Sequence, residues 1–257
     1  MKIGIVQGRL TTPVGNRIQE FPIFWKHELD SLKKINLNHI EWIVTKDSFP
    51  YNPIFFNDLS EYPISSICAD NLIDTRISDE EFLKFQLYPI CKAALRSKIE
   101  YITIPLLEDS EVSERNKRQE FCNNILQASR DFPNLKFSFE AELHPELLQE
   151  IINLSNRFFV TYDTGNMTSC GFIHEKSINL LFDKINNVHL KDRTYDGKTM
   201  LPGSGETNFE NIFQFLNGKG YNKLFTLQTA REKTGDEKET ILKHKKYFEE
   251  LYYAKSI

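Results

Sequence analysis

Asn187-Val188-His189-Leu190-Lys191-Asp192-Arg193 is the stretch that decides how the rest of the chain is interpreted. It begins with the alternation of polar and apolar residues that is typical of a strand, and it ends in residues that can bind a metal or carry charge. Three other segments also end in a polar residue that could share a metal with His189. They are Phe137-Ser138-Phe139-Glu140, Val160-Thr161-Tyr162-Asp163 and Phe225-Thr226-Leu227-Gln228. The shared pattern predicts four strand ends that meet at one polar site.

Short β-rich runs alternate with longer helical runs along the whole chain. Strands are predicted at 2–7, 39–44, 63–69, 100–104, 135–140, 158–163, 185–190 and 223–228. Helices are predicted at 24–35, 52–61, 79–97, 113–130, 145–154, 174–183, 209–217 and 236–252. Eight strand-then-helix units without a linker predict one α/β domain over residues 1–257, a single (β/α)8 TIM barrel. A doubly wound open sheet is the alternative, but the chain lacks a G-x-G-x-x-G turn after its first strand.

The alternation of faces along a strand separates an inward set of residues from an outward set. If the four strand-end residues point into the barrel, their neighbours Phe139, Tyr162, Val188 and Leu227 point outward at the helices. Two positions before each strand end, the inward side chains are Ser138, Thr161, Asn187 and Thr226. The outward set is apolar or aromatic, as helix packing requires. The inward set is small and polar, as expected beneath a polar site.

Composition excludes several classes of protein. The chain has 257 residues, of which 40% are hydrophobic and 26% charged, as in ordinary globular proteins. A net charge of −4 gives no support for nucleic-acid binding. The four cysteines are widely spaced without a C-x-x-C pair, which indicates reduced thiols in a cytoplasmic protein. We expect neither a signal peptide nor a membrane-spanning segment.

The residue types at the four strand ends indicate metal chemistry. A neutral imidazole, two carboxylates and an amide oxygen can hold a divalent ion and leave positions open for water or substrate. This mixture suits Mn²⁺, Mg²⁺, Co²⁺ or Zn²⁺ without selecting among them. All four residues fall at the carboxyl ends of strands, where TIM barrels have their active sites.

The chain resembles the xylose-isomerase-like TIM-barrel family of sugar phosphate isomerases and epimerases. The segments that carry the resemblance are GIVQGRL, IEW, CAD, SFEAE, YDTGN, NVHLKDR, PGSGE and LQTAR. Family members hold a divalent ion with Glu, Asp, His and Glu from strands five to eight. The first three carry over to Glu140, Asp163 and His189, whereas the fourth position is Gln228.

Gln228 at the fourth position limits the reactions that this site can catalyse. In family epimerases the two metal-binding glutamates act on opposite faces of the sugar, and the metal stabilises the cis-enediolate between the two proton transfers. A glutamine amide can donate an oxygen to a metal but cannot carry a proton. The resemblance therefore implies either isomerisation with Glu140 as the only base, or epimerisation in which another residue supplies the second proton. The candidates for that residue are Glu41, Asp70, Asp192 and Glu206.

Further residues are predicted to line the pocket. Lys191 shares its face with His189 and is a catalytic candidate. Candidates for substrate binding are Gln7, Arg9, Glu41, Asp70, Asn166 and Arg231. Arg9 either contacts a substrate anion or pairs with an acidic loop, and Glu41 either has a site role or forms an internal salt bridge. Arg231 could hold a phosphate or carboxylate.

Two remaining patterns favour a structural interpretation. Gly203-Ser204-Gly205 resembles a phosphate cradle, although a turn leading into a helix is the favoured interpretation. We expect His27, His39, His174 and His244 to be surface or helix residues.

Rival functions remain. Apurinic endonucleases share this barrel, but they use a three-metal site rich in histidine and face DNA with positive charge, which this chain lacks. A sugar dehydratase on the same metal site and a catalytically inactive sugar-binding barrel are the alternatives. The expected partner is a small-molecule sugar or sugar phosphate, with no nucleic acid and no membrane, and a homodimer is compatible with the family.

Overall fold

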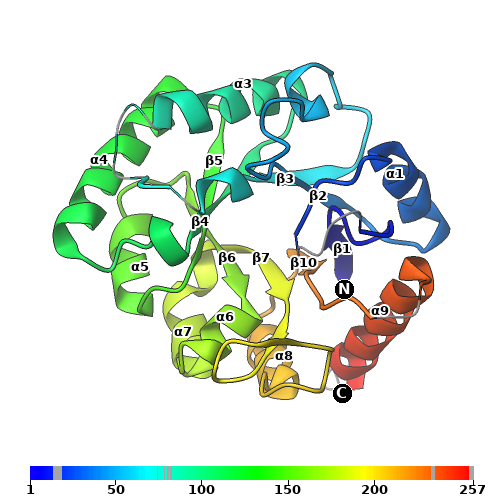
Figure 1. Cartoon of the computed structure of the whole chain (residues 1–257). Helices are drawn as coiled ribbons and strands as arrows, with labels where there is room; N and C mark the ends of the chain where they lie inside the picture. The colour runs from blue at the N-terminus through cyan, green and yellow to red at the C-terminus, as the bar shows by residue number, and fades with distance from the viewer. Residues whose placement is uncertain are drawn as a thin grey trace. The chain divides into compact units, whose positions relative to one another are not determined.

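Eight parallel strands close a barrel, as the sequence predicts. The structure is a computed structural model, and it describes residues 1–13, 19–73, 75–77, 79, 81, 83–232 and 235–254. Around the barrel the strands follow the order β1-β10-β7-β6-β5-β4-β3-β2 (Figure 1). Their bounds are Lys2–Val6 (β1), Ile40–Ile43 (β2), Ile64–Cys68 (β3), Tyr101–Leu106 (β4), Lys136–Ala141 (β5), Phe158–Asp163 (β6), Ile185–Leu190 (β7) and Leu224–Leu227 (β10). The predicted (β/α)8 TIM barrel is confirmed.

The chain groups into two compact units, which are described separately. The first comprises Met1–Ile40 and Tyr162–Ile257, and the second comprises Glu41–Thr161. One domain over residues 1–257 stays a prediction.

The helices of the first unit pack on its strands through aromatic side chains. They are α1 (Trp25–Lys34), α6 (Thr164–Ser169), α7 (His174–Leu181), the 3-10 turn η5 (Phe182–Lys184), α8 (Phe209–Gly218) and α9 (Glu237–Ala254). Phe213 of α8 contacts Phe225 of β10 edge-on with ring centroids 5.9 Å apart, and it contacts Phe248 of α9 at 6.4 Å. Two short strands, β8 (Asp192–Arg193) and β9 (Thr199–Met200), form an antiparallel hairpin in a region predicted as loop.

The second unit departs from the predicted helices in two places. The helix predicted at 52–61 is wrong, since only the 3-10 turn η1 (Pro53–Phe55) forms there. Asn52 caps this turn while it also accepts a hydrogen bond from the Trp42 indole, at 2.9 Å, so its side chain fixes a turn. The helix predicted at 79–97 includes residues 80 and 82, which lie outside the described residues. Its described part is the π-helix η3 (Leu83–Leu87) followed by α3 (Tyr88–Arg96), and Pro89 at the junction lacks the N–H that a continuous α-helix uses.

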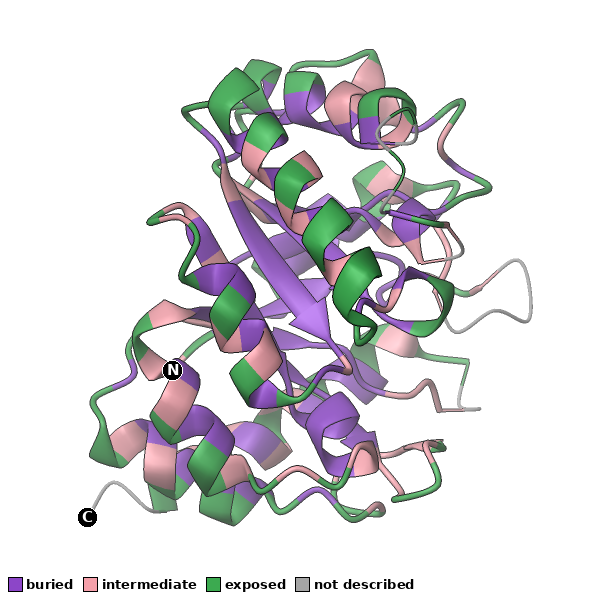
Figure 2. Ribbon diagram, turned by 90° about the vertical axis from the view of Figure 1, so that its left-hand side faces the viewer, coloured by how far each residue is buried: buried purple, intermediate pink, exposed green. Residues whose placement is uncertain are grey.

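The other helical elements of the second unit agree with the prediction or are short turns. They are η2 (Asp70–Leu72), η4 (Glu108–Ser110), α4 (Arg115–Asp131) and α5 (Pro145–Ile152). Figure 2 shows helices striped with buried and exposed residues beside buried strands, which is the pattern of helices that cover a sheet with one face.

The predicted inward and outward faces of the strands are confirmed by contacts. Phe139 of β5 contacts Phe121 of α4 with ring centroids 5.8 Å apart, so it points outward. On the opposite face of β5, the Ser138 hydroxyl is 2.7 Å from the Thr161 hydroxyl of β6. In the first unit, the Thr226 hydroxyl donates to Asn187 at 2.8 Å. A hydrogen-bonded polar layer therefore lies inside each group of strands, beneath the strand ends.

Among the described residues, none of the helices combines the length and the apolarity needed to cross a bilayer.

Candidate metal centre

Three of the four predicted ligands come together at strand ends. Glu140, Asp163 and His189 each offer one ligand atom, and these atoms lie within 4.8 Å of one another. Glu140 lies on β5, Asp163 ends β6 and His189 lies on β7. All three side chains are buried, with exposed fractions of 2%, 3% and 0%. Two carboxylates and an imidazole at this spacing fit a divalent cation, because buried charges of this kind require a compensating partner.

Asp163 is fixed by the helix that follows it. Its Oδ1 accepts the backbone N–H of Asn166 at 2.7 Å, so the residue caps the N-terminus of α6. Its Oδ2 is 3.6 Å from the ammonium of Lys191, which also donates to Asn166 Oδ1 at 3.3 Å. The structure thus brings Lys191 and Asn166 beside Asp163. Their catalytic and substrate-binding roles stay predictions.

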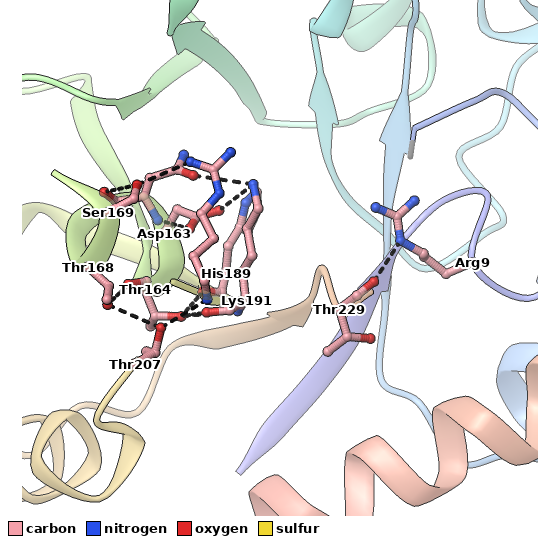
Figure 3. A network of polar contacts seen from close by, with 11 residues as sticks. Arg9, Asp163, Thr164, Thr168, Ser169, His189, Lys191, Thr207 and Thr229 are labelled. Atoms are coloured by element: carbon pink, nitrogen blue, oxygen red, sulfur yellow. Dashed lines mark hydrogen bonds and ion pairs between the residues drawn. The ribbon is translucent and has the colours of Figure 1, made fainter. Parts of the chain in front are cut away.

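A set of threonine hydroxyls holds the ends of β6 and β7 together (Figure 3). The Thr164 hydroxyl lies 2.7 Å from the carbonyl oxygen of Lys191 and accepts the Lys191 N–H at 3.0 Å. Thr168 donates to the Thr164 carbonyl at 2.8 Å and is 3.1 Å from the Thr207 hydroxyl. These bonds fix the backbone that carries His189 and Lys191 against α6. Thr164 belongs to the sequence motif YDTGN, but the sequence alone gave it no role.

Gln228 directly follows β10, next to β7. Its N–H donates to the Leu190 carbonyl at 3.2 Å, and its side chain is 2% exposed. Among the described residues, its Oε1 is buried and has no hydrogen-bond partner. A buried amide oxygen without a partner is costly, so it fits donation to a cation or to a substrate hydroxyl. Its role as the fourth ligand stays a prediction.

The loop after β1 holds Gln7 and Arg9, which are 0% and 2% exposed. Arg9 Nε donates to the Thr229 carbonyl at 3.3 Å, which directs its terminal nitrogens away from Thr229 (Figure 3). Glu28 of α1 accepts the N–H groups of Gly8 and Leu10, each at 2.8 Å. Burial raises the pKa of the Glu28 carboxyl, and these two hydrogen bonds act in the opposite direction.

Arg231, which lies near the other end of the chain, also forms hydrogen bonds with the loop after β1. It donates to the carbonyl oxygens of Gly8 and Thr11, the latter at 3.1 Å, and its guanidinium is 3.6 Å from the Glu237 carboxylate. These contacts give Arg231 a structural role. Its predicted contact with a substrate anion stays a prediction.

Glu41 and Asp70 belong to the second unit. Glu41 is fully buried on β2, and its Oε1 accepts the hydroxyls of Ser66 at 2.8 Å and Thr103 at 2.6 Å. These two hydroxyl hydrogen bonds make Glu41 part of the inner polar layer of the second unit. Asp70 begins η2, two residues after the end of β3, and is half-buried. Substrate binding by either residue stays a prediction.

Two histidines have roles that the sequence did not reveal. The prediction for His39 was wrong, because it lies before β2, is 5% exposed and has its Nε2 3.0 Å from the Thr226 hydroxyl. Its ring packs on Gly4, where a Cβ atom would stand 2.3 Å from it. The sequence did indicate that His39 is buried, since residue 39 lies on the same face of the predicted strand as residue 41.

His174 does begin a helix, as expected, but it also packs behind Asp163. Its Nδ1 is 2.7 Å from the Tyr162 hydroxyl and its Nε2 is 3.0 Å from Thr168 Oγ1. Burial lowers the pKa of His174 to about 4, while the charge of Asp163 acts in the opposite direction. Burial also raises the pKa of Tyr162 well above its usual value.

Comparison with known proteins supports the fold. The family described as "Xylose isomerase-like TIM barrel" matches residues 134–251. No curated protein matches the chain. The resemblance seen in the sequence is confirmed.

Solved structures with the same barrel cover nearly the whole chain. An IolI protein with a bound zinc atom is 15% identical, with a TM-score of 0.77 over 99% of both chains. A D-tagatose 3-epimerase-like protein is 16% identical, with a TM-score of 0.74 over 99% of this chain and 98% of the other. The probable 3-DHS dehydratase AsbF from Bacillus anthracis is 15% identical, with a TM-score of 0.68 over 95% and 98%. At these identities the likeness shows the fold.

Proposed function

We propose that this xylose isomerase-like TIM barrel is a divalent-metal-dependent isomerase or epimerase of a sugar or sugar phosphate. The observation that carries the proposal is the buried cluster of Glu140, Asp163 and His189. The structural neighbours support this class of reaction, since they include proteins named as a tagatose 3-epimerase-like protein, an L-ribulose 3-epimerase and a 3-keto-D-glucoside 4-epimerase. The zinc atom named in the IolI structure supports a divalent cation.

Glu140 is the proposed base. When bound, the cation would polarise the carbonyl of the sugar and so make the neighbouring C–H group more acidic. A carboxylate oxygen of Glu140 then removes that proton, which leaves a cis-enediolate of the sugar. If the same carboxyl returns the proton to the adjacent carbon, and the hydroxyl proton passes from one enediolate oxygen to the other, the product is the aldose or ketose isomer.

Lys191 and Gln228 are proposed to assist without carrying this proton. The Lys191 ammonium is held beside Asp163 at 3.6 Å and Asn166 at 3.3 Å, and from there its positive charge would stabilise the negative charge that develops on an enediolate. The Gln228 amide oxygen accepts a substrate hydroxyl or donates to the cation. The proposed substrate-binding residues are Gln7, Arg9, Glu41, Asp70, Asn166 and Arg231.

A sugar dehydratase is the second candidate. Elimination also begins with proton removal beside a carbonyl, and the neighbour AsbF is named as a probable 3-DHS dehydratase. A catalytically inactive sugar-binding barrel is the remaining alternative.

The test combines metal analysis of the purified protein with exchange of solvent deuterium into a panel of ketoses and ketose phosphates. We expect a bound divalent ion and exchange that Glu140→Gln abolishes. Glu142→Gln is the matched control, because Glu142 is half-buried two residues further along and should leave exchange unchanged. Absence of both metal and exchange across the panel would favour the sugar-binding barrel, and water loss from the substrate would favour the dehydratase.

Gln228→Glu separates isomerase from epimerase. If a second base is what the site lacks, this variant should gain or increase 3-epimerase activity, measured by NMR of the sugar products. If it loses metal or activity instead, the amide itself is required.

A further inference from the structure

The loop between β7 and α8 closes around a carboxylate of its own chain. The N–H groups of Gly203 and Gly205 both donate to Asp192 Oδ2 at 2.9 Å, and the N–H of Thr207 donates to Oδ1 at 3.2 Å. Asp192 is 1% exposed. We call these three N–H groups the 203–207 nest, because converging backbone donors of this kind form concavities that bind anions.

The two glycines of the nest are required for different reasons. Gly203 has a positive φ of 78°, a conformation that residues with a side chain rarely adopt. A Cβ atom at Gly205 would stand 2.3 Å from Asp192 Oδ1 and 2.9 Å from the Arg193 carbonyl oxygen. The backbone therefore approaches Asp192 as closely as it does only because residue 205 has no side chain.

The nest lies where TIM barrels often hold a phosphate. Such sites are formed by backbone N–H groups of the loops after the seventh and eighth strands. Here β7 is the seventh barrel strand, and its loop carries the nest. Asp192 directly follows Lys191 in the chain, and the Lys191 ammonium is 3.6 Å from Asp163.

We propose that Asp192 is a specificity-determining residue that occupies this nest and excludes a phosphate group from it. Two anions cannot share one set of donors, because each of the three N–H groups is already used and the carboxylate repels a second negative charge. The inference rests on the proposed function, which it narrows: the preferred substrate is a sugar that presents hydroxyl groups, and no phosphate, to the loop after β7.

The first test empties the nest. Asp192→Ala should bind formate, which matches the lost carboxylate, and inorganic phosphate. Binding is measured as a saturable rise in melting temperature and as shifts of the Gly203 and Gly205 amide signals in NMR spectra. The wild type should show neither response. Asp58→Ala is the control, since Asp58 is an exposed residue that accepts the backbone N–H of Ser60 at 2.9 Å. Asp192→Ser replaces the alanine variant if that variant does not fold.

Three outcomes would overturn the proposal. The first is phosphate binding at the Gly203 and Gly205 amides of the wild type, and the second is a variant nest that binds neither anion. In the third, the variant binds formate but not phosphate, which would mean that the loop is too small for phosphate whether or not Asp192 fills it.

The second test uses the wild-type enzyme and compares deuterium exchange into ketoses with exchange into their phosphates. We expect kcat/KM to favour the unphosphorylated sugars by at least about tenfold. A preference for a ketose phosphate would overturn the inference while leaving the proposed function intact. If no sugar exchanges, the proposed function fails, and the anion-binding experiment still decides whether Asp192 blocks the nest.

Discussion

The loops that follow β1 and β7 both present a cation at the strand ends, and in both a carboxylate holds backbone N–H groups. After β1, Glu28 binds the N–H groups of Gly8 and Leu10 beside Arg9. After β7, Asp192 binds the 203–207 nest beside Lys191. The two carboxylates come from different places: Glu28 from a neighbouring helix, Asp192 from the loop itself.

This difference separates a loop whose backbone N–H groups are held by a residue of another element from one whose N–H groups are held by a residue of the same loop. The loop after β1 requires α1 for Glu28 and also Arg231, which lies more than 200 positions away in sequence. Its hydrogen bonds to Glu28 are buried, whereas those of Gly203 and Gly205 are partly exposed. Water can replace a lost acceptor in the second loop but not in the first.

Glu28→Ala should have the largest effect on stability. It leaves two buried N–H groups without an acceptor, which should lower the free energy of unfolding by roughly 3 kcal/mol after the gain from no longer burying a carboxylate. Asp192→Ala should cost about half as much. Urea unfolding of both variants checks the order, and an equal or larger loss for Asp192→Ala would break the distinction drawn between the two loops.

Acid should loosen the loop after β7 through His174, whose neighbour Thr168 contacts Thr207. The pKa of His174 is about 4 in the folded protein and near 6.5 when unfolded. The stability gained by burying the neutral His174 imidazole is therefore fully present above pH 6.5 and is lost as the pH falls towards 4. The loss should be roughly 2 kcal/mol, reduced from the full shift because the ring is not wholly excluded from water.

Urea unfolding at pH 7 and pH 4.5 checks this, with His174→Gln as the comparison. The variant should lose less stability on acidification than the wild type does. Hydrogen exchange should show faster opening at 203–207 than at 8–11 in the acidified wild type. Equal pH dependence of the wild type and the variant would contradict this role of His174.

Thr164→Val should have the smallest effect on stability and a local effect on the site. It removes the acceptor of the Lys191 N–H, so exchange of that amide should accelerate, and unfolding should become easier by about 1 kcal/mol. Affinity for Zn²⁺ should fall about tenfold, because groups that orient a metal ligand act on binding through it. Thr164→Ser, which keeps the hydroxyl, should restore both values. Thr45→Val is the control, since the Thr45 hydroxyl exchanges hydrogen bonds with Ser48 in the turn after β2.

The barrel could be predicted because its strands carry strong local signals. β6 and β7 were predicted with correct ends, since the last four residues of each alternate outward apolar and inward polar side chains and are followed by a change of pattern. The same parity predicted that Glu140, Asp163 and His189 share a site, and the structure brings their ligand atoms together. The fold and the metal cluster thus depended on periodicity and position.

Features that depend on distant or unusual contacts could not be predicted in this way. The helix α6 has the sequence TGNMTS, which has weak helix propensity, and it forms where Asp163 caps it. The roles of Glu28, Arg231 and His39 require partners that lie far away along the chain or on another strand. For these residues the sequence shows which side chain is present but not which residue it contacts in the fold.

The contact between Gly4 and His39 has a consequence for the evolution of this barrel. The imidazole occupies the space that a side chain at residue 4 would need, and it reaches Thr226 from there. Because interiors are closely packed, a larger residue at position 4 is tolerable only together with a smaller one at position 39. The two positions are therefore epistatic: along any lineage, a change at one sets which substitutions the other can accept.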